Sequence, residues 1–160
     1  MGEWSTLLAV QAGAAATLTG LVFVAVSINL SKIMAVHGLS GRAAESIFQL
    51  LQVFFIATAG LIPHQSDWAF GVELLVISTA LWMAQLTAQL RYLSKRAGHP
   101  WSWFVTRALA TQLATIPFWV AGIELLVGMP GGTYWLVPGF VFSFAAGVLS
   151  AWVLLIEILR

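Results

Sequence analysis

The chain has 160 residues, of which 60% are hydrophobic and 8% are charged, and its mean hydropathy is +0.93. A soluble domain carries about 25% charged residues, so this chain has too little charge to cover a water-exposed surface. It has no cysteine, which excludes disulfides, thiolate metal ligands and cysteine nucleophiles, and a formal net charge of +1 is too small for a nucleic-acid partner. The composition predicts an integral membrane protein, with the lipid bilayer as its partner.

Five segments are apolar enough to be the helices of a single transmembrane domain that occupies residues 1–160. A helix needs about 20 mostly apolar residues to cross about 30 Å of hydrocarbon. In chain order the expected spans are residues 7–30, 43–62, 68–90, 103–127 and 134–158. Pro63 closes the second span, Ser66 and Asp67 are suited to cap the third, and the glycine-rich residues 128–133 predict a turn before the fifth. We expect an all-α bundle of five transmembrane helices.

The second span is the least hydrophobic, because it contains Glu45, Gln49 and Gln52. The placement of basic residues supports it: residues 31–42 hold two of them and residues 91–102 hold three. Loops rich in Lys and Arg face the cytoplasm, so an even number of crossings must separate these two loops. Two crossings satisfy this rule, which places the N-terminus outside and the C-terminus in the cytoplasm.

The predicted outer side carries acidic residues and no Lys or Arg. Glu73 and Glu124 lie about one helical turn from that side, in helices that run in opposite directions. Such carboxylates can reach the headgroups at little cost or pair with Ser, Thr or Trp donors. Together with Asp67 and His64 they can also form an outer acidic cluster that binds cations or shares a proton.

Residues 68–76 and 119–127, which contain these two glutamates, are identical at six of nine positions. Chance or convergence in a Leu- and Val-rich chain is one explanation. A duplication is the other, although it would place one copy at the start of a helix and the other at the end of one.

Polar side chains recur at helical spacing in the predicted cytoplasmic half. The set comprises Glu45, Gln49 and Gln52 in the second span, Gln85 and Gln89 in the third, and Arg107, Thr111 and Thr115 in the fourth, with Gln112 alongside. Steps of three or four residues place side chains on one helical face. Unpaired amides are costly in lipid, so these faces either hold helices together or line a polar cavity or pore. Glu45 and Arg107 lie at similar depth and can form an ion pair.

Two features of the spans concern packing. Ala12, Ala16 and Gly20 form a row of small residues, which lets helices approach closely within a subunit or between subunits. Pro117 lies inside the fourth span and frees a backbone carbonyl near Leu113. A helix with such a proline can bend there.

The segment Gly-Ala-Ala-Ala-Thr-Leu-Thr-Gly-Leu-Val-Phe-Val-Ala-Val-Ser-Ile-Asn-Leu at residues 13–30 resembles the first helix of a group of small bacterial multi-pass inner-membrane proteins without assigned function. Some members are labelled modulators of a membrane protease. Residues 62–65 (Ile-Pro-His-Gln) and 71–75 (Gly-Val-Glu-Leu-Leu) resemble the same group, so that about a quarter of the chain is covered. The resemblance implies a bacterial inner (plasma) membrane location and transfers no functional residue.

No nucleotide-binding, zinc-protease or serine-hydrolase motif is present, and His37, His64 and His99 fall in expected loops. We therefore expect no enzyme activity, no cofactor and no metal site. The leading hypothesis is a homo-oligomeric channel or small-solute pore, with cations as a candidate cargo, an acidic outer entrance and a polar cytoplasmic half. The alternatives are a non-catalytic regulatory or structural subunit that binds another membrane protein, and a carrier for a small metabolite.

Overall fold

The computed structural model describes residues 2–35, 39–94 and 101–159, and every regular element within those ranges is a helix. In chain order the elements are η1 (Gly2–Trp4), α1 (Ser5–Ile28), α2 (Leu30–Ala35), α3 (Leu39–Ala59), α4 (Asp67–Ser94), α5 (Trp101–Val127), η2 (Gly132–Trp135) and α6 (Leu136–Leu159). The expected all-α class is therefore confirmed.

Four segments are long and apolar enough to cross a membrane: Ser5–Ile28, Asp67–Arg91, Phe104–Val127 and Gly132–Ile156. They correspond to the first, third, fourth and fifth predicted spans. Helix α3, which corresponds to the second, is not among them, because its charged and amide side chains lower its hydropathy. It is nevertheless as enclosed as any part of the bundle, with 11 of its 21 residues buried.

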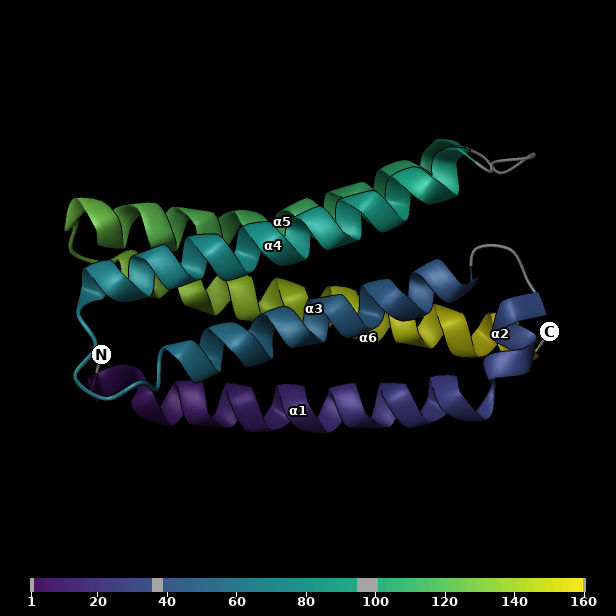
Figure 1. The fold of residues 1–160 in the computed structure, drawn as a ribbon, viewed down its shortest axis with the longest axis horizontal. Coiled ribbons are helices and arrows are strands. Elements are labelled where there is room, and N and C mark those ends of the chain that lie inside the picture. The colour runs from purple at the N-terminus through teal and green to yellow at the C-terminus, as the bar shows by residue number, and fades with distance from the viewer. Residues whose placement is uncertain (1, 36–38, 95–100, 160) are drawn as a thin grey trace.

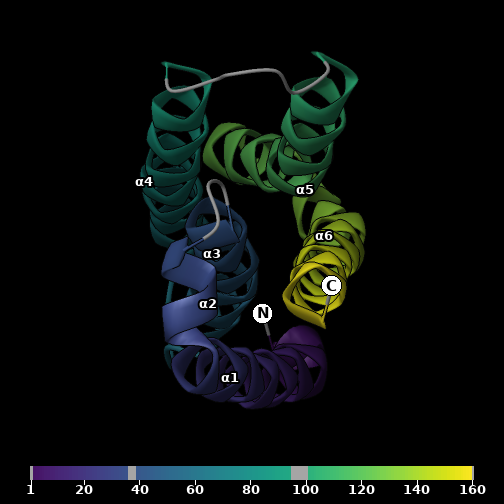
Figure 2. The same ribbon diagram turned by 90° about the vertical axis from the view of Figure 1, so that its right-hand side faces the viewer.

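The long helices run alternately in opposite directions along one common axis (Figure 1). Helices α3, α4, α5 and α6 are successive neighbours around a four-helix bundle, and α1 packs along the outside of α3 (Figure 2). We call one end of the bundle the acidic end, because it holds Glu3, Asp67, Glu73 and Glu124. We call the opposite end the basic end, because it holds Lys32, Arg42, Arg91 and Arg107.

Three helix boundaries differ from the predicted ones. The first span was expected to run through residue 30, but α1 ends at Ile28, and Asn29 (φ −104°, ψ 15°) separates it from α2. Arg42 was expected in a loop before the second span; it lies in the first turn of α3 and is 7% exposed. Helix α3 also ends at Ala59, three residues before the expected end of that span. Lys95, Arg96, His37 and His99 lie outside the described residues.

The expected stop and start signals at the acidic end are present. The backbone N–H of Ala69 donates to the Ser66 hydroxyl at 3.2 Å, so that Ser66 caps α4. Helix α5 ends at Val127 and is followed by Gly128, whose φ of 75° is in the left-handed region that glycine tolerates. Met129 N–H then donates to Glu124 O at 2.9 Å, which completes a Schellman turn.

Apolar side chains fill the interior of the acidic half. The main buried cluster consists of Leu8, Ala15, Val53, Ile56, Ala57, Phe70, Leu74, Phe118, Ala121, Leu125, Leu136 and Phe140. The rings of Phe118 and Phe140 meet edge to face, with centroids 5.5 Å apart. Gly139 makes room for them, because a Cβ there would lie 2.5 Å from the Phe118 ring. Packed rings therefore close this half of the bundle.

The similar segments 68–76 and 119–127 pack against each other where α4 and α5 cross. A Cβ on Gly71 would lie 2.9 Å from the Gly122 carbonyl oxygen, and one on Gly122 would lie 3.1 Å from the Gly71 carbonyl oxygen. Leu126 contacts Gly71, and Leu75 contacts Gly122 in the reciprocal way. The repeated Gly and Leu positions thus form a self-complementary contact between antiparallel helices.

Gly71→Ala should destabilise the protein, because the added methyl group would meet backbone that cannot rotate away. Overpacking of this kind costs about 1–3 kcal/mol. We expect a lower thermal unfolding midpoint in detergent micelles. The matched control is Gly13→Ala, where nothing lies within 4 Å of the added Cβ. Equal stability of the two variants would show that the α4–α5 contact is not tight.

Candidate functional site

The polar side chains predicted to share helical faces lie in the interior of the four-helix bundle, in its basic half. The buried ones are Glu45, Gln49 and Gln52 on α3, Gln85 and Gln89 on α4, and Thr111 and Thr115 on α5, with Arg107 reaching in beside them. Gln112 differs, since it is half-buried and does not line the cavity described below. One interior space therefore receives polar groups from three helices.

Glu45 and Arg107 join α3 to α5 across the bundle. Arg107 Nε donates to Glu45 Oε2 at 2.9 Å, and Arg107 Nη2 donates to Glu45 Oε1 at 2.7 Å. The side chains of Arg107 and Glu45 are 10% and 6% exposed. This bidentate geometry is the strongest form of a carboxylate–guanidinium pair, and it uses both oxygens of the carboxylate.

Amides and hydroxyls form the next layer toward the bundle centre. Gln49 Nε2 donates to Gln85 Oε1 at 2.8 Å, which joins α3 to α4. Gln89 Nε2 donates to the Thr111 hydroxyl at 3.0 Å, which joins α4 to α5. Thr111 in turn donates to the backbone carbonyl of Arg107 at 3.1 Å. The layer thus continues inward from the ion pair.

Several buried polar atoms in this region have no hydrogen-bond partner among the described residues. They are Oε1 of Gln49, Nε2 of Gln85, both amide atoms of Gln52 and the hydroxyl of Thr115. Each such atom costs about 1–3 kcal/mol in a protein interior. Buried polar atoms of this kind are normally satisfied by ordered water or by a bound polar molecule.

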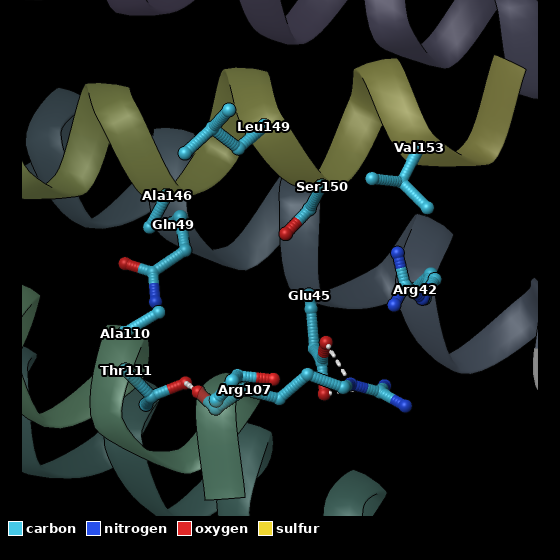
Figure 3. Close-up of a pocket in the computed structure, with 11 residues that line it drawn as sticks. Arg42, Glu45, Gln49, Arg107, Ala110, Thr111, Ala146, Leu149, Ser150 and Val153 are labelled. Atoms are coloured by element: carbon cyan, nitrogen blue, oxygen red, sulfur yellow. Dashed lines mark hydrogen bonds and ion pairs between the residues drawn. The ribbon is translucent and has the colours of Figure 1, made fainter. Parts of the chain in front are cut away.

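A cavity of about 140 Å³ opens between α3, α5 and α6 in the basic half. Its polar lining consists of Arg42, Glu45, Gln49, Thr106, Arg107, Thr111 and Ser150. Figure 3 shows Arg42 and the Arg107 guanidinium on one side of Glu45, with Gln49 and Thr111 toward the other end of the cavity. The cavity therefore leads from the charged residues to the amide layer.

Sequence reasoning did not identify Arg42, Thr106 and Ser150 as lining residues. Arg42 lies three residues before Glu45, so the period of α3 could have included it had the helix start been placed correctly. Ser150 is one of only a few polar residues in the very apolar α6, where single serines give no periodic signal. Two other serines connect neighbouring helices. Ser46 of α3 donates to the backbone carbonyl of Gly147 on α6 at 2.8 Å, and Ser143 of α6 donates to the backbone carbonyl of Ala114 on α5 at 3.4 Å.

The residues of the predicted outer acidic cluster share the acidic end but occupy separate environments. Glu73 accepts a 2.6 Å hydrogen bond from Gln65, and Glu124 accepts a 3.1 Å bond from the Trp135 indole. Asp67 lines a second cavity, of about 450 Å³, together with Glu3. His64 is exposed, with φ 58°. Within the described ranges, no three His, Asp or Glu side chains are grouped to hold a metal ion.

The small-residue row of α1 lies largely outside the packing of the bundle. Ala16 and Gly20 are exposed, and a Cβ on Gly20 would have nothing within 4 Å. Ala12 is half-buried against the apolar cluster, and Ala15 and Leu8, rather than the row itself, are the fully buried residues of α1. Most of the row is therefore available to a second helix.

Comparison of the chain with protein-family models, with curated proteins and with solved structures finds no match.

Arg107→Met should destabilise the protein strongly, because it leaves the Glu45 carboxylate unpaired in the interior. The expected loss is about 3–5 kcal/mol of unfolding free energy. The double variant Glu45→Leu with Arg107→Met removes both charges and should recover most of that loss. Unfolding in mixed detergent micelles measures all three proteins. A double variant as unstable as Arg107→Met would show that pairing of the two charges is not what stabilises the fold.

Proposed function

We propose that the chain is a bacterial inner-membrane protein that forms a small-solute pore or channel, as a homo-oligomer in which each protomer supplies its own path. The observation that carries this proposal is the inward-facing polar row of α3, α4 and α5, which contains buried amides and a buried hydroxyl without partners among the described residues. In a helix bundle with an apolar exterior, such groups are expected to line a route for polar molecules.

In this proposal α3 is a fifth membrane crossing. Helices α1, α4 and α6 all pack against it, so little of its surface needs to be compatible with lipid. A crossing helix shielded in this way tolerates Glu45, Gln49 and Gln52, because they face the interior. The low hydropathy that sets α3 apart is then a consequence of its position.

The proposed orientation places the basic end in the cytoplasm and the N-terminus outside. Lys32, Arg42, Arg91 and Arg107 lie at the basic end, whereas the acidic end contains no Lys or Arg in the part of the chain that the structure describes. This asymmetry agrees with the preference of Lys and Arg for the cytoplasmic side.

The proposed path is open to polar molecules in the basic half and closed in the acidic half. Phe70, Phe118 and Phe140 are fully buried there and fill the interior. Passage therefore requires the Phe118 ring to move. Pro117, the residue before it, lies inside α5 and removes a helical hydrogen bond, which allows α5 to bend next to the ring.

Two classes of cargo are consistent with such a pore. The carboxylates at the acidic end favour cations at the entrance. The amides and hydroxyls of the interior favour neutral polar molecules. A flux assay must therefore include both classes.

Phe118→Ala should increase solute flux into proteoliposomes several-fold over the wild-type protein, because it removes one of the three fully buried phenylalanine rings that fill the closed half. Stopped-flow light scattering with water and urea, and a K⁺-sensitive dye, measure the flux. The matched control is Phe23→Ala, since Phe23 is 62% exposed on α1. If neither wild type nor Phe118→Ala exceeds protein-free vesicles for any of these solutes, the proposed pore is wrong.

A regulatory or structural subunit is the second candidate function, and the surface of α1 favours it. Only 11% of the most apolar window of α1 is buried inside the protomer. Thr17, which lies beside this row, donates its hydroxyl back to Gly13 O at 2.8 Å and so needs no outside partner. The same surface would serve either another membrane protein or a second copy of this chain.

Replacement of Ala12, Ala16 and Gly20 by Leu should disperse the native complex, because bulky side chains prevent close approach of a second helix. Native mass spectrometry of the complex extracted from its own membrane gives the composition before and after the change. The control is Ala80→Leu with Ala145→Leu, two exposed alanines on α4 and α6. If the α1 variant alone loses a different protein from the complex, the result supports a regulatory or structural subunit. If the α1 variant alone loses copies of its own chain, the result supports a homo-oligomer. An unaltered complex excludes α1 as the interface.

A further inference from the structure

The lining of the interior changes in character from the basic end toward the bundle centre. At the basic end Arg107 engages both carboxylate oxygens of Glu45, at 2.9 and 2.7 Å. Charges paired at this distance attract a passing ion far less than either charge alone. The buried polar side chains that follow include Gln49, Gln52, Gln85, Gln89, Thr111 and Thr115. These are carboxamides and hydroxyls, which carry dipoles and no charge.

The amides and hydroxyls at the centre keep unused hydrogen-bonding capacity of both kinds. The Gln49–Gln85 bond uses one amide atom of each residue and leaves the other without a partner in the described chain. Gln52 and Thr115 are 0% exposed, and neither amide atom of Gln52 nor the Thr115 hydroxyl bonds a described residue. Whichever way a Gln amide is turned, it presents one acceptor and one donor group. Donors and acceptors therefore stand side by side.

These groups continue the line of the cavity. Gln49 and Thr111 line it directly, and Gln52 and Thr115 follow three and four residues later on the same helical faces. The cavity measures about 140 Å³. Since a water molecule takes up about 30 Å³ in the liquid, this space suits a few waters or one small organic molecule.

We infer that the cargo is a small uncharged molecule that both donates and accepts hydrogen bonds, with the chemistry and size of water or urea, and that Gln52 and Thr115 select it. This inference rests on the proposed pore function. A cation that leaves water needs a shell of oxygen ligands. Here the oxygens of Gln49, Gln52 and Thr115 are accompanied by the N–H groups of Gln52 and Gln85, which repel a cation. A neutral amide instead exchanges its hydrogen bonds to water for bonds to these side chains, without the cost of desolvating a charge.

The acidic end does not alter this choice of cargo. Glu73 and Glu124 each accept a hydrogen bond from a neighbouring side chain, Gln65 and Trp135. Neither glutamate lines the cavity of the basic half. Between them and Gln52 lies the apolar cluster with its phenylalanines. The carboxylates at the acidic end can attract cations to that surface, but they do not reach Gln52 and therefore do not change which molecules it selects.

The test measures urea, water and K⁺ permeation of proteoliposomes that contain the full-length protein, in the wild-type and Phe118→Ala backgrounds. We expect urea and water to pass and K⁺ to be excluded. Gln52→Leu combined with Thr115→Val should lower urea permeation about tenfold, the effect of losing one to two hydrogen bonds. Thr115→Val alone, which keeps the shape of the side chain, should give part of that loss. Thermal unfolding confirms that each variant is folded.

The control is Gln112→Leu with Thr17→Val, the same chemical changes outside the cavity, which should leave urea permeation unchanged. Passage of K⁺ without urea would overturn the inference and leave the pore intact. Equal urea permeation in the wild type and in the Gln52→Leu, Thr115→Val variant would show that these two residues do not select the cargo. Absence of all flux, in the Phe118→Ala background as well, would overturn both the inference and the pore.

Discussion

Glu45 and Arg107 belong to helices that face each other across the bundle, and their pairing restricts how both helices can be rotated. In a bundle with an apolar exterior, neither charge can be turned outward or left without the other. The rotation that brings them together also turns Gln49 and Gln52 inward on α3, and Thr111 and Thr115 inward on α5, because these residues follow at helical spacing. The polar interior of the basic half is thus a geometric consequence of one ion pair and the period of the helix.

The two halves of the bundle are stabilised by different interactions. In the acidic half, packed rings and a Gly–Gly contact between α4 and α5 give close steric fit. In the basic half, directional bonds such as Gln49–Gln85 and Gln89–Thr111 connect the helices, and some capacity is left unused. Close packing resists the entry of molecules, whereas an incompletely bonded polar interior favours it. The same set of helices therefore has a closely packed apolar interior in one half and an incompletely hydrogen-bonded polar interior in the other.

Periodic features of the sequence predicted much of this arrangement, and isolated features did not. Spacing of three and four residues correctly grouped Glu45 with Gln49 and Gln52, because helical period alone decides which side chains share a face. The Ser66 cap and the glycine turn after α5 were equally visible, because they depend on local backbone chemistry. Ser150 and the break at Asn29 were missed, since a single polar residue in an apolar helix has no pattern that distinguishes it.

Tertiary contacts also changed the meaning of some patterns. Segments 68–76 and 119–127 each contain a glutamate, Glu73 and Glu124, yet the shared glycines and leucines are what meet where α4 and α5 cross. Glu73 and Glu124 instead accept hydrogen bonds from Gln65 and Trp135, which lie outside the helices of the two glutamates, so that helical spacing does not relate them. Arg42 was misassigned because charge was used to locate a loop, whereas burial in the bundle allows a charge within a helix.

Helix α1 packs mainly along α3, with a minor contact to α6, whereas α3, α4, α5 and α6 each have two neighbours within a closed ring. Leu8 and Ala15 of α1 join the apolar cluster of the acidic half, but most of α1 is exposed, so fewer buried contacts hold α1 than hold the helices of the ring. In the proposed membrane-embedded protein, pulling from the N-terminus should extract α1 first, at low force, before the ring yields as a whole. We therefore expect the ring to provide most of the resistance to a pulling force and α1 to be the first element to detach.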